Sequence, residues 1–98
     1  MAKTLIIGGK EYPIRATYRA QRYAIEKYPQ EKLSGMTLAE AHDYTLDLAL
    51  QILAGDPKPF ETIEDLMDAL SSEEFNAIDT DVAYIVFGRE KPEAPGKQ

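Results

Sequence analysis

The sequence contains no cysteine, no tryptophan and only one histidine. Without cysteine the chain can form no disulfide, no zinc–thiolate site and no thiol nucleophile. Its hydrophobic residues are scattered, and no apolar run approaches the roughly 20 residues that a membrane-spanning helix needs. Only a short apolar run, Leu5 to Ile7, stands before the first glycine pair, which is too little for a signal peptide. We therefore expect a protein that is made and used in the cytoplasm.

What the chain does contain is typical of one small globular domain. It has 98 residues, of which 44% are hydrophobic, a content too high for a disordered chain. This length leaves no room for two domains. Residues 89–98 are rich in proline and charge, which predicts a flexible charged tail. We expect a single domain over residues 1–88.

Charge is divided unevenly along the chain. Residues 1–37 carry seven basic and three acidic side chains, a net of +4, whereas residues 38–87 carry twelve acidic side chains and only Lys58, a net of −11. Residues 88–98 add +1, which gives the net charge of −6. This balance argues against binding nucleic acid, which needs clustered Lys and Arg. The basic and acidic parts can attract each other within one chain or between copies, and the sequence favours neither.

The first residues have the pattern of a β-hairpin, predicted over residues 3–16. Gly8–Gly9 can adopt the positive φ angles of a two-residue turn between two apolar strands. The pairs that this turn predicts are Leu5 with Tyr12 and Ile7 with Lys10. The side chains that then share one face are Leu5, Ile7, Tyr12 and Ile14. Pro13 has no amide hydrogen to donate, so we expect its outer side to be an open edge.

Helical periodicity follows the hairpin. The helices are predicted over about residues 17–28, 38–54, 62–70 and 72–87, with a loop over residues 29–36. Capping boxes mark two of the starts, Thr37 with Glu40 and Ser71 with Glu74. The side chains expected to face the core include Leu38, Thr45, Leu48, Ala49, Ile52, Leu53, Ile63, Leu66, Met67 and Leu70. The sequence thus predicts an α+β fold, mainly α, with an N-terminal β-hairpin packed on a bundle of three to four helices.

Patterns for catalysis or metal binding are scarce. His42 is the only imidazole, and a general base or a metal ligand is one interpretation of it. A solvent-facing or capping side chain is favoured, because no second ligand or nucleophile accompanies it. Asp79-Thr80-Asp81 lacks the glycine and the glutamate of a calcium loop and is interpreted as helix surface. We expect no catalytic, cofactor or metal site, and no enzyme.

Tyrosine is the most frequent aromatic residue, with six copies. It combines apolar area with a polar tip and is enriched at protein interfaces. Tyr18, Tyr23 and Tyr28 lie too close in sequence for all of them to enter one small core. They are either half-buried where the hairpin meets the helices or part of a patch that faces a partner.

The opening of the chain resembles a known family. The segment Leu5–Ile14 (LIIGGKEYPI) reads as an apolar strand, a Gly-Gly-Lys-x-Tyr turn and a second apolar strand. It passes directly into a helix that starts with Thr17–Glu26 (TYRAQRYAIE), and an acidic helical body follows. This order is similar to that of the tail assembly chaperones of long-tailed, siphovirus-like bacteriophages and prophages.

The resemblance implies a physical function and no catalysis. Such a chaperone binds the long, helical tape measure protein and covers its apolar stripes during tail assembly. By this analogy the chain acts in the cytoplasm of a bacterial host as a homo-oligomer, with no cofactor, membrane or nucleic acid. A groove between the hairpin and the helices, near Tyr18, Tyr23 and Tyr44, would bind the tape measure protein.

The family also makes an extended form, often by a ribosomal frameshift near the stop codon. The codons of Pro95-Gly96-Lys97 permit such a shift without requiring it. The extended form would recruit the tail tube protein.

An alternative function follows from the acidic body alone. A small regulatory or inhibitor protein can mimic nucleic acid and block an enzyme that binds DNA. Salt separates the two hypotheses, because mimicry weakens steeply as salt rises and binding in an apolar groove does not.

Overall fold

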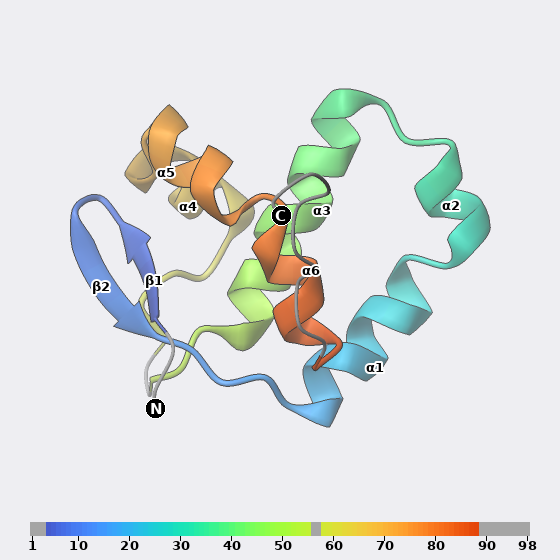
Figure 1. Cartoon of the computed structure of the whole chain (residues 1–98), viewed down its shortest axis with the longest axis horizontal. Coiled ribbons are helices and arrows are strands. Elements are labelled where there is room, and N and C mark those ends of the chain that lie inside the picture. The colour runs from blue at the N-terminus through green and yellow to red at the C-terminus, as the bar shows by residue number, and fades with distance from the viewer. Residues whose placement is uncertain (1–3, 56–57, 89–98) are drawn as a thin grey trace, which may run out of the picture.

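The computed structural model describes residues 4–55 and 58–88 and has the α+β, mainly α architecture that the sequence predicts (Figure 1). Its strands are β1 (Thr4–Ile7) and β2 (Lys10–Pro13). Its helices are α1 (Tyr18–Lys27), α2 (Gln30–Ser34), α3 (Leu38–Ile52), α4 (Ile63–Ala69), α5 (Ser72–Ile78) and α6 (Asp81–Val86). Within these residues no helix is both long and apolar enough to cross a membrane. The tail predicted at 89–98 lies outside the described residues.

The hairpin has the register that its turn predicts. Leu5 pairs with Tyr12 and Ile7 with Lys10 in an antiparallel ladder. Gly8 and Gly9 have φ angles of +63° and +79°, which side chains with a Cβ rarely adopt. A Cβ on Gly8 would also lie 3.2 Å from the backbone oxygen of Ala69. The turn therefore requires glycine for its own conformation and for its close approach to the end of α4.

The open edge predicted at Pro13 is wrong. The carbonyl oxygen of Pro13 accepts a hydrogen bond from the amide of Ala54 at 3.0 Å. Next to it, Ile14 forms an isolated antiparallel bridge with Leu53, and the amide of Arg15 donates to the carbonyl of Ile52 at 2.7 Å. The chain that leaves α3 thus covers this side of β2, which the sequence did not indicate because the partner is almost 40 residues away.

Glu74 ties the hairpin to the helices. Its carboxylate accepts hydrogen bonds from the amides of Gly8 and Gly9, both at 2.8 Å. The same carboxylate completes the predicted capping box of α5 by accepting from the amide of Ser71 at 3.0 Å. These backbone donors, with Ser71 first and the two glycines next, hold the pKa of Glu74 below its usual value. One side chain therefore caps α5 and anchors the turn.

Replacing Glu74 with glutamine is expected to loosen the hairpin turn without unfolding the protein. The amide side chain keeps one acceptor oxygen but loses the second one and the negative charge. Hydrogen exchange at the amides of Gly8 and Gly9 should become faster, while exchange in α3 stays unchanged. Glu73→Gln is the matched control, because Glu73 is an exposed neighbour in the same helix. Equal protection of both glycines in the two variants would contradict the anchor.

Helix α3 is the centre of the core, with α1, α4 and α6 packed directly against it (Figure 1). Of the side chains predicted to face inward, the following are buried: Thr45, Leu48, Ala49, Ile52, Leu53 and Leu66. The predictions for Leu38 and Met67 are wrong, since both side chains are largely exposed. Met67 borders a cleft between α3, α4 and α5, and Leu38 is the first residue of α3.

Two helix boundaries also differ from the prediction. The segment predicted as a loop over residues 29–36 contains α2, which begins directly after Pro29, a residue that suits the start of a helix. The helix predicted over residues 72–87 is divided into α5 and α6 at Asp79-Thr80. The Asp79 carboxylate accepts a hydrogen bond from the Thr45 hydroxyl at 3.0 Å, which holds this junction against α3. The acidic tripeptide is thus a junction between two helices and not the surface of one.

Candidate functional site

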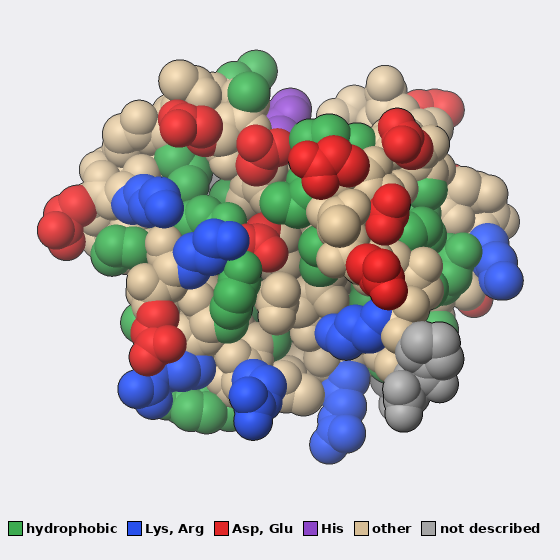
Figure 2. Space-filling view, turned by 180° about the vertical axis from the view of Figure 1, so that it is seen from behind, with side chains coloured by type: hydrophobic (Ala, Val, Ile, Leu, Met, Phe, Trp, Pro, Cys, Tyr) green, Lys and Arg blue, Asp and Glu red, His purple; other side chains and the backbone are tan. Residues whose placement is uncertain are grey.

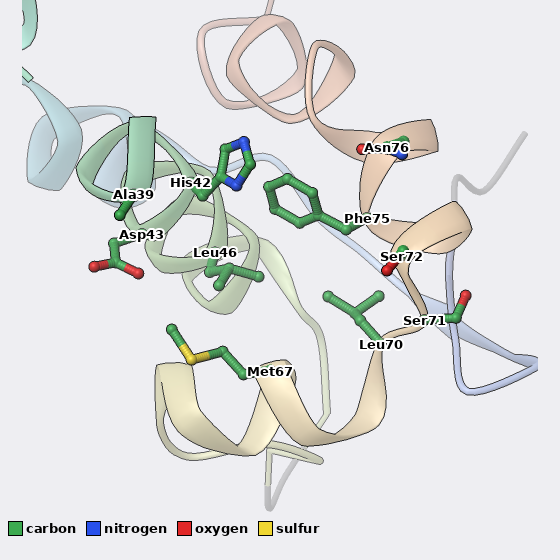
Figure 3. Close-up of a pocket in the computed structure, with 10 residues that line it drawn as sticks. All are labelled: Ala39, His42, Asp43, Leu46, Met67, Leu70, Ser71, Ser72, Phe75 and Asn76. Atoms are coloured by element: carbon green, nitrogen blue, oxygen red, sulfur yellow. The ribbon is translucent and has the colours of Figure 1, made fainter. Parts of the chain in front are cut away.

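An open cleft of about 550 Å³ lies between α3, α4 and α5 (Figure 3). Helix α3 forms one wall, α4 with the residue that ends it forms the second, and the start of α5 forms the third. The lining side chains are Ala39, His42, Asp43, Leu46, Met67, Leu70, Ser71, Ser72, Phe75 and Asn76. Residues 39, 42, 43 and 46 share one face of α3 because helix positions three and four apart are neighbours.

The position of α4 follows from one buried side chain. Leu66 is fully buried and is the buried residue of this seven-residue helix. Thr62 begins the helix by accepting a hydrogen bond from the amide of Asp65 at 3.1 Å. Successive residues of a helix are rotated by about 100°, so the next residue, Met67, points to the side of Leu66 and not directly into the core. Its side chain is 50% exposed and borders the cleft.

The interior of the cleft is apolar and aromatic. The rings of His42 and Phe75 lie 4.5 Å apart between centroids, at an interplanar angle of 51°. Figure 3 shows the two rings next to each other at one edge of the cleft, with Leu46, Leu70 and Met67 below them. His42 is therefore a half-buried wall residue that is partly open to solvent, and its contact with Phe75 is a feature that the sequence did not indicate. In the described part of the chain, no group of three or more His, Cys, Asp or Glu side chains is placed to hold a metal ion.

The surroundings of the cleft are acidic. Asp43 borders it, and the carboxylate of Asp43 makes no hydrogen bond or ion pair with any described residue. Helix α4 exposes three further carboxylates, Glu64, Asp65 and Asp68. On the face drawn in Figure 2, acidic side chains gather mainly in the upper part, around the histidine, and Lys and Arg mainly in the lower part. The cleft thus combines apolar walls with a negative potential.

Tyr23 of α1 and Tyr28, which ends this helix, meet a buried carboxylate of α3. Asp47 is only 4% exposed and accepts hydrogen bonds from the hydroxyls of Tyr23 and Tyr28, at 2.9 and 2.6 Å. Lys27 completes the cluster with an ion pair to Asp47 at 3.1 Å. Burial acts to raise the pKa of Asp47, but the hydrogen bonds from Tyr28, Lys27 and Tyr23 outweigh it and lower that pKa. This cluster fastens α1 to α3.

The tyrosines predicted as a partner site are therefore divided. Tyr18 is exposed, and with Tyr23 it borders a shallow depression along α1. Tyr44 is turned toward Tyr28, with ring centroids 4.7 Å apart. The half-buried state expected for Tyr23 and Tyr28 is confirmed, but the expected place is wrong, because they lie between α1 and α3 and not between hairpin and helices.

A groove between the hairpin and the helices is present, but its lining includes no tyrosine. It has a volume of about 440 Å³ and runs between β1 and the helices α5 and α6. Its lining includes Ile6, Glu73, Ala77 and Ile85. The cleft of α3, α4 and α5 is larger and is lined by the rings of His42 and Phe75, whereas the lining of the groove includes no aromatic ring, so the cleft is the stronger candidate site.

In comparisons with protein-family models, with curated proteins and with solved structures, nothing matches this chain. The candidate site is therefore judged from its own geometry and charge.

Sequence reasoning missed the cleft, and the apolar pattern gave no signal for it. Ile63, Leu66, Met67 and Leu70 have the i, i+3, i+4, i+7 spacing of a single apolar face, so nothing local marks Met67 as the residue that faces another surface. A signal was present for Asp47, because it interrupts the otherwise apolar run of residues 46–50. A carboxylate within a buried run requires hydrogen-bond donors that are buried beside it.

Proposed function

We propose that the protein is a phage tail assembly chaperone whose cleft of α3, α4 and α5 holds an amphipathic helix of the tape measure protein. It acts by binding and catalyses no reaction. In this proposal it works in the cytoplasm of the bacterial host, before the tail tube encloses the tape measure protein. An extended form that recruits the tail tube protein belongs to the same proposal.

The observation that carries the proposal is the apolar surface left open beside the core. A helix-binding groove offers side-chain pockets between two or more helices, into which residues one helical turn apart can insert. Met67 and Phe75 are placed for this on different walls of the cleft, with Leu46 at its base. The exposed Leu38 lies one turn before His42 on α3 and extends the same apolar strip. A tape measure helix has the apolar stripe that such a strip would cover.

The charge of the body supports a chaperone function as well. An aggregation-prone helix stays in solution when the complex carries net charge of one sign. Residues 38–87 carry a net of −11, and the acidic side chains of α4 lie on the exposed side of the wall that bears Met67. The hairpin and the first turns of α1, which resemble the family, provide the second line of support.

Replacing Met67 with serine is expected to weaken binding of the tape measure protein by at least about tenfold, as truncation of a central interface side chain commonly does. Ile6→Ser is the matched control, because Ile6 is 49% exposed in the hairpin, against 50% for Met67. Binding is measured by calorimetry with peptides that cover the helices of the tape measure protein from the same phage or prophage. Unchanged affinity of Met67→Ser, with a folded far-UV circular dichroism spectrum, would contradict the proposal.

Nucleic-acid mimicry remains the second candidate, because α4 exposes Glu64, Asp65 and Asp68 along one short helix. Repeating the binding measurement at high salt separates the two functions. Groove binding should persist, because apolar contacts are not screened. A steep loss of binding to a DNA-binding enzyme, with no peptide binding at any salt concentration, would favour mimicry.

A further inference from the structure

We propose that the exposed face of α1 docks in the cleft of a second copy, so that the protein associates with itself head to tail. The inference uses only surfaces of this chain, and it does not depend on the tape measure protein being the partner.

Helix α1 has an outer face that the fold leaves uncovered. Ala20 and Ala24 are buried against the body of the protein. Tyr18, Arg22 and Ile25 lie on the opposite side of the helix, at spacings of four and three residues. Tyr18 is exposed, and Ile25 is 48% exposed. This face therefore presents two apolar side chains around a guanidinium group.

The basic charges of this region are not neutralised by the acidic body of the same chain. Among the described residues, one ion pair joins them, between Lys27 and Asp47 at 3.1 Å. The other ion pair, between Arg22 and Glu26 at 2.9 Å, lies within α1 and is exposed, so it contributes little. The side chain of Arg19 makes no hydrogen bond or ion pair in the described part of the chain. The sequence left open whether the basic and acidic parts attract each other within one chain or between copies. Within one chain this attraction is therefore small.

The outer face of α1 and the cleft are complementary in chemistry. Tyr18 and Ile25 match the apolar walls of Met67 and Phe75, and Arg22 matches the unpaired carboxylate of Asp43. The contact would place opposite charges beside an apolar centre, the usual arrangement of a specific interface. A helix face that reads Tyr-Arg-Ile at these spacings also indicates what kind of partner helix the cleft accepts.

The two surfaces lie on different sides of the molecule. In Figure 1, α1 lies at the lower right and α4 and α5 at the upper left, with α3 between them. One chain cannot fill its own cleft with its own α1, so the contact must join two copies. Because the surfaces are different, the interface is heterologous and each copy leaves one surface open for the next. The products are rings or short chains, and a partner helix in the cleft would compete with the neighbouring copy.

Charge reversal on each surface tests the proposal by sedimentation velocity over a wide range of protein concentration. The wild type is expected to form larger species as its concentration rises. Arg22→Glu puts a negative charge on α1, and Asp43→Arg puts a positive charge in the cleft. Each variant alone should associate at least about tenfold more weakly, because like charges then meet. An equimolar mixture should regain association, since the acidic α1 of the first variant fits the basic cleft of the second.

Controls separate this inference from the proposed function. Glu11→Lys changes net charge as a charge reversal does but lies on the hairpin, and it should associate like the wild type. Ile25→Ser should lose self-association without any change of charge. Arg22→Glu should still bind a partner helix, because the cleft of this variant is intact. A monomeric wild type at all concentrations, or variants that associate normally, would overturn the inference whatever the result for partner binding. Partner binding that is lost in Met67→Ser but kept in Ile25→Ser, together with loss of self-association in Ile25→Ser, would support both proposals.

Discussion

Replacing Leu66 with alanine is expected to lower the free energy of unfolding by about 3 kcal/mol. The side chain is fully buried and is the buried anchor of α4. A helix of seven residues is too short to persist by its own hydrogen bonds, so it depends on this contact. Truncation removes the apolar contact and leaves a cavity in the core. Urea unfolding followed by far-UV circular dichroism measures the change.

Met67→Ala is the control for this prediction, because it removes a side chain of similar size from the next position of the same helix. Met67 is half exposed, so we expect a loss below about 1 kcal/mol. The two neighbours thus separate stability from binding, since Leu66 supports the fold and Met67 faces the cleft. Equal losses for the two variants would mean that α4 is oriented differently and that Met67 is not a cleft residue.

Replacing Asp47 with asparagine is expected to lower the free energy of unfolding by about 2 kcal/mol. The carboxylate accepts from both tyrosine hydroxyls and pairs with Lys27. The amide keeps the shape but removes the charge, and its NH₂ group puts a donor where the cluster needs an acceptor. Asp68→Asn is the matched control, because Asp68 is exposed on α4 and should change stability by less than about 0.5 kcal/mol.

The Asp47 variant should also change the response to acid. The pKa of Asp47 is lower in the folded protein than in the unfolded chain, so its ionised form contributes stability above the unfolded value of about 4. This contribution is lost as the pH falls from there through the folded-state pKa. As the pH falls from neutral to below the folded-state pKa of Asp47, the free energy of unfolding should therefore decrease more for the wild type than for Asp47→Asn. If the free energies of unfolding of the two proteins changed in parallel over this pH range, Asp47 would not be the carboxylate that causes the loss of stability in acid.

Features that depend on neighbouring residues could be predicted from the sequence. The hairpin register follows from Gly8–Gly9, and the start of α3 follows from the capping box of Thr37 with Glu40, whose two hydrogen bonds are present at 2.8 and 3.2 Å. Both are set within a few residues, where turn and cap geometry leave few alternatives. The α+β class could be predicted from the same signals.

Features that depend on residues distant in the sequence could not be predicted from it. The strand edge of Pro13 is covered by residues 53–54, and the junction at Asp79 is held by Thr45. Periodicity identifies the apolar face of a helix but not how much of it a neighbour covers, which is why Met67 was placed in the core. The tyrosines were assigned to a partner for a similar reason, because nothing local shows that the hydroxyl of Tyr23 meets Asp47.

The double role of Glu74 has a consequence for the order of events during synthesis. The hairpin is synthesised before the carboxylate that anchors its turn, which follows more than 60 residues later. A two-stranded hairpin alone is marginally stable, so it must wait for this late partner. The next residue, Phe75, is a wall of the cleft. The same short helix thus anchors the hairpin and completes the wall of the cleft, so that the apolar surface forms only after residues 4–75 have been made.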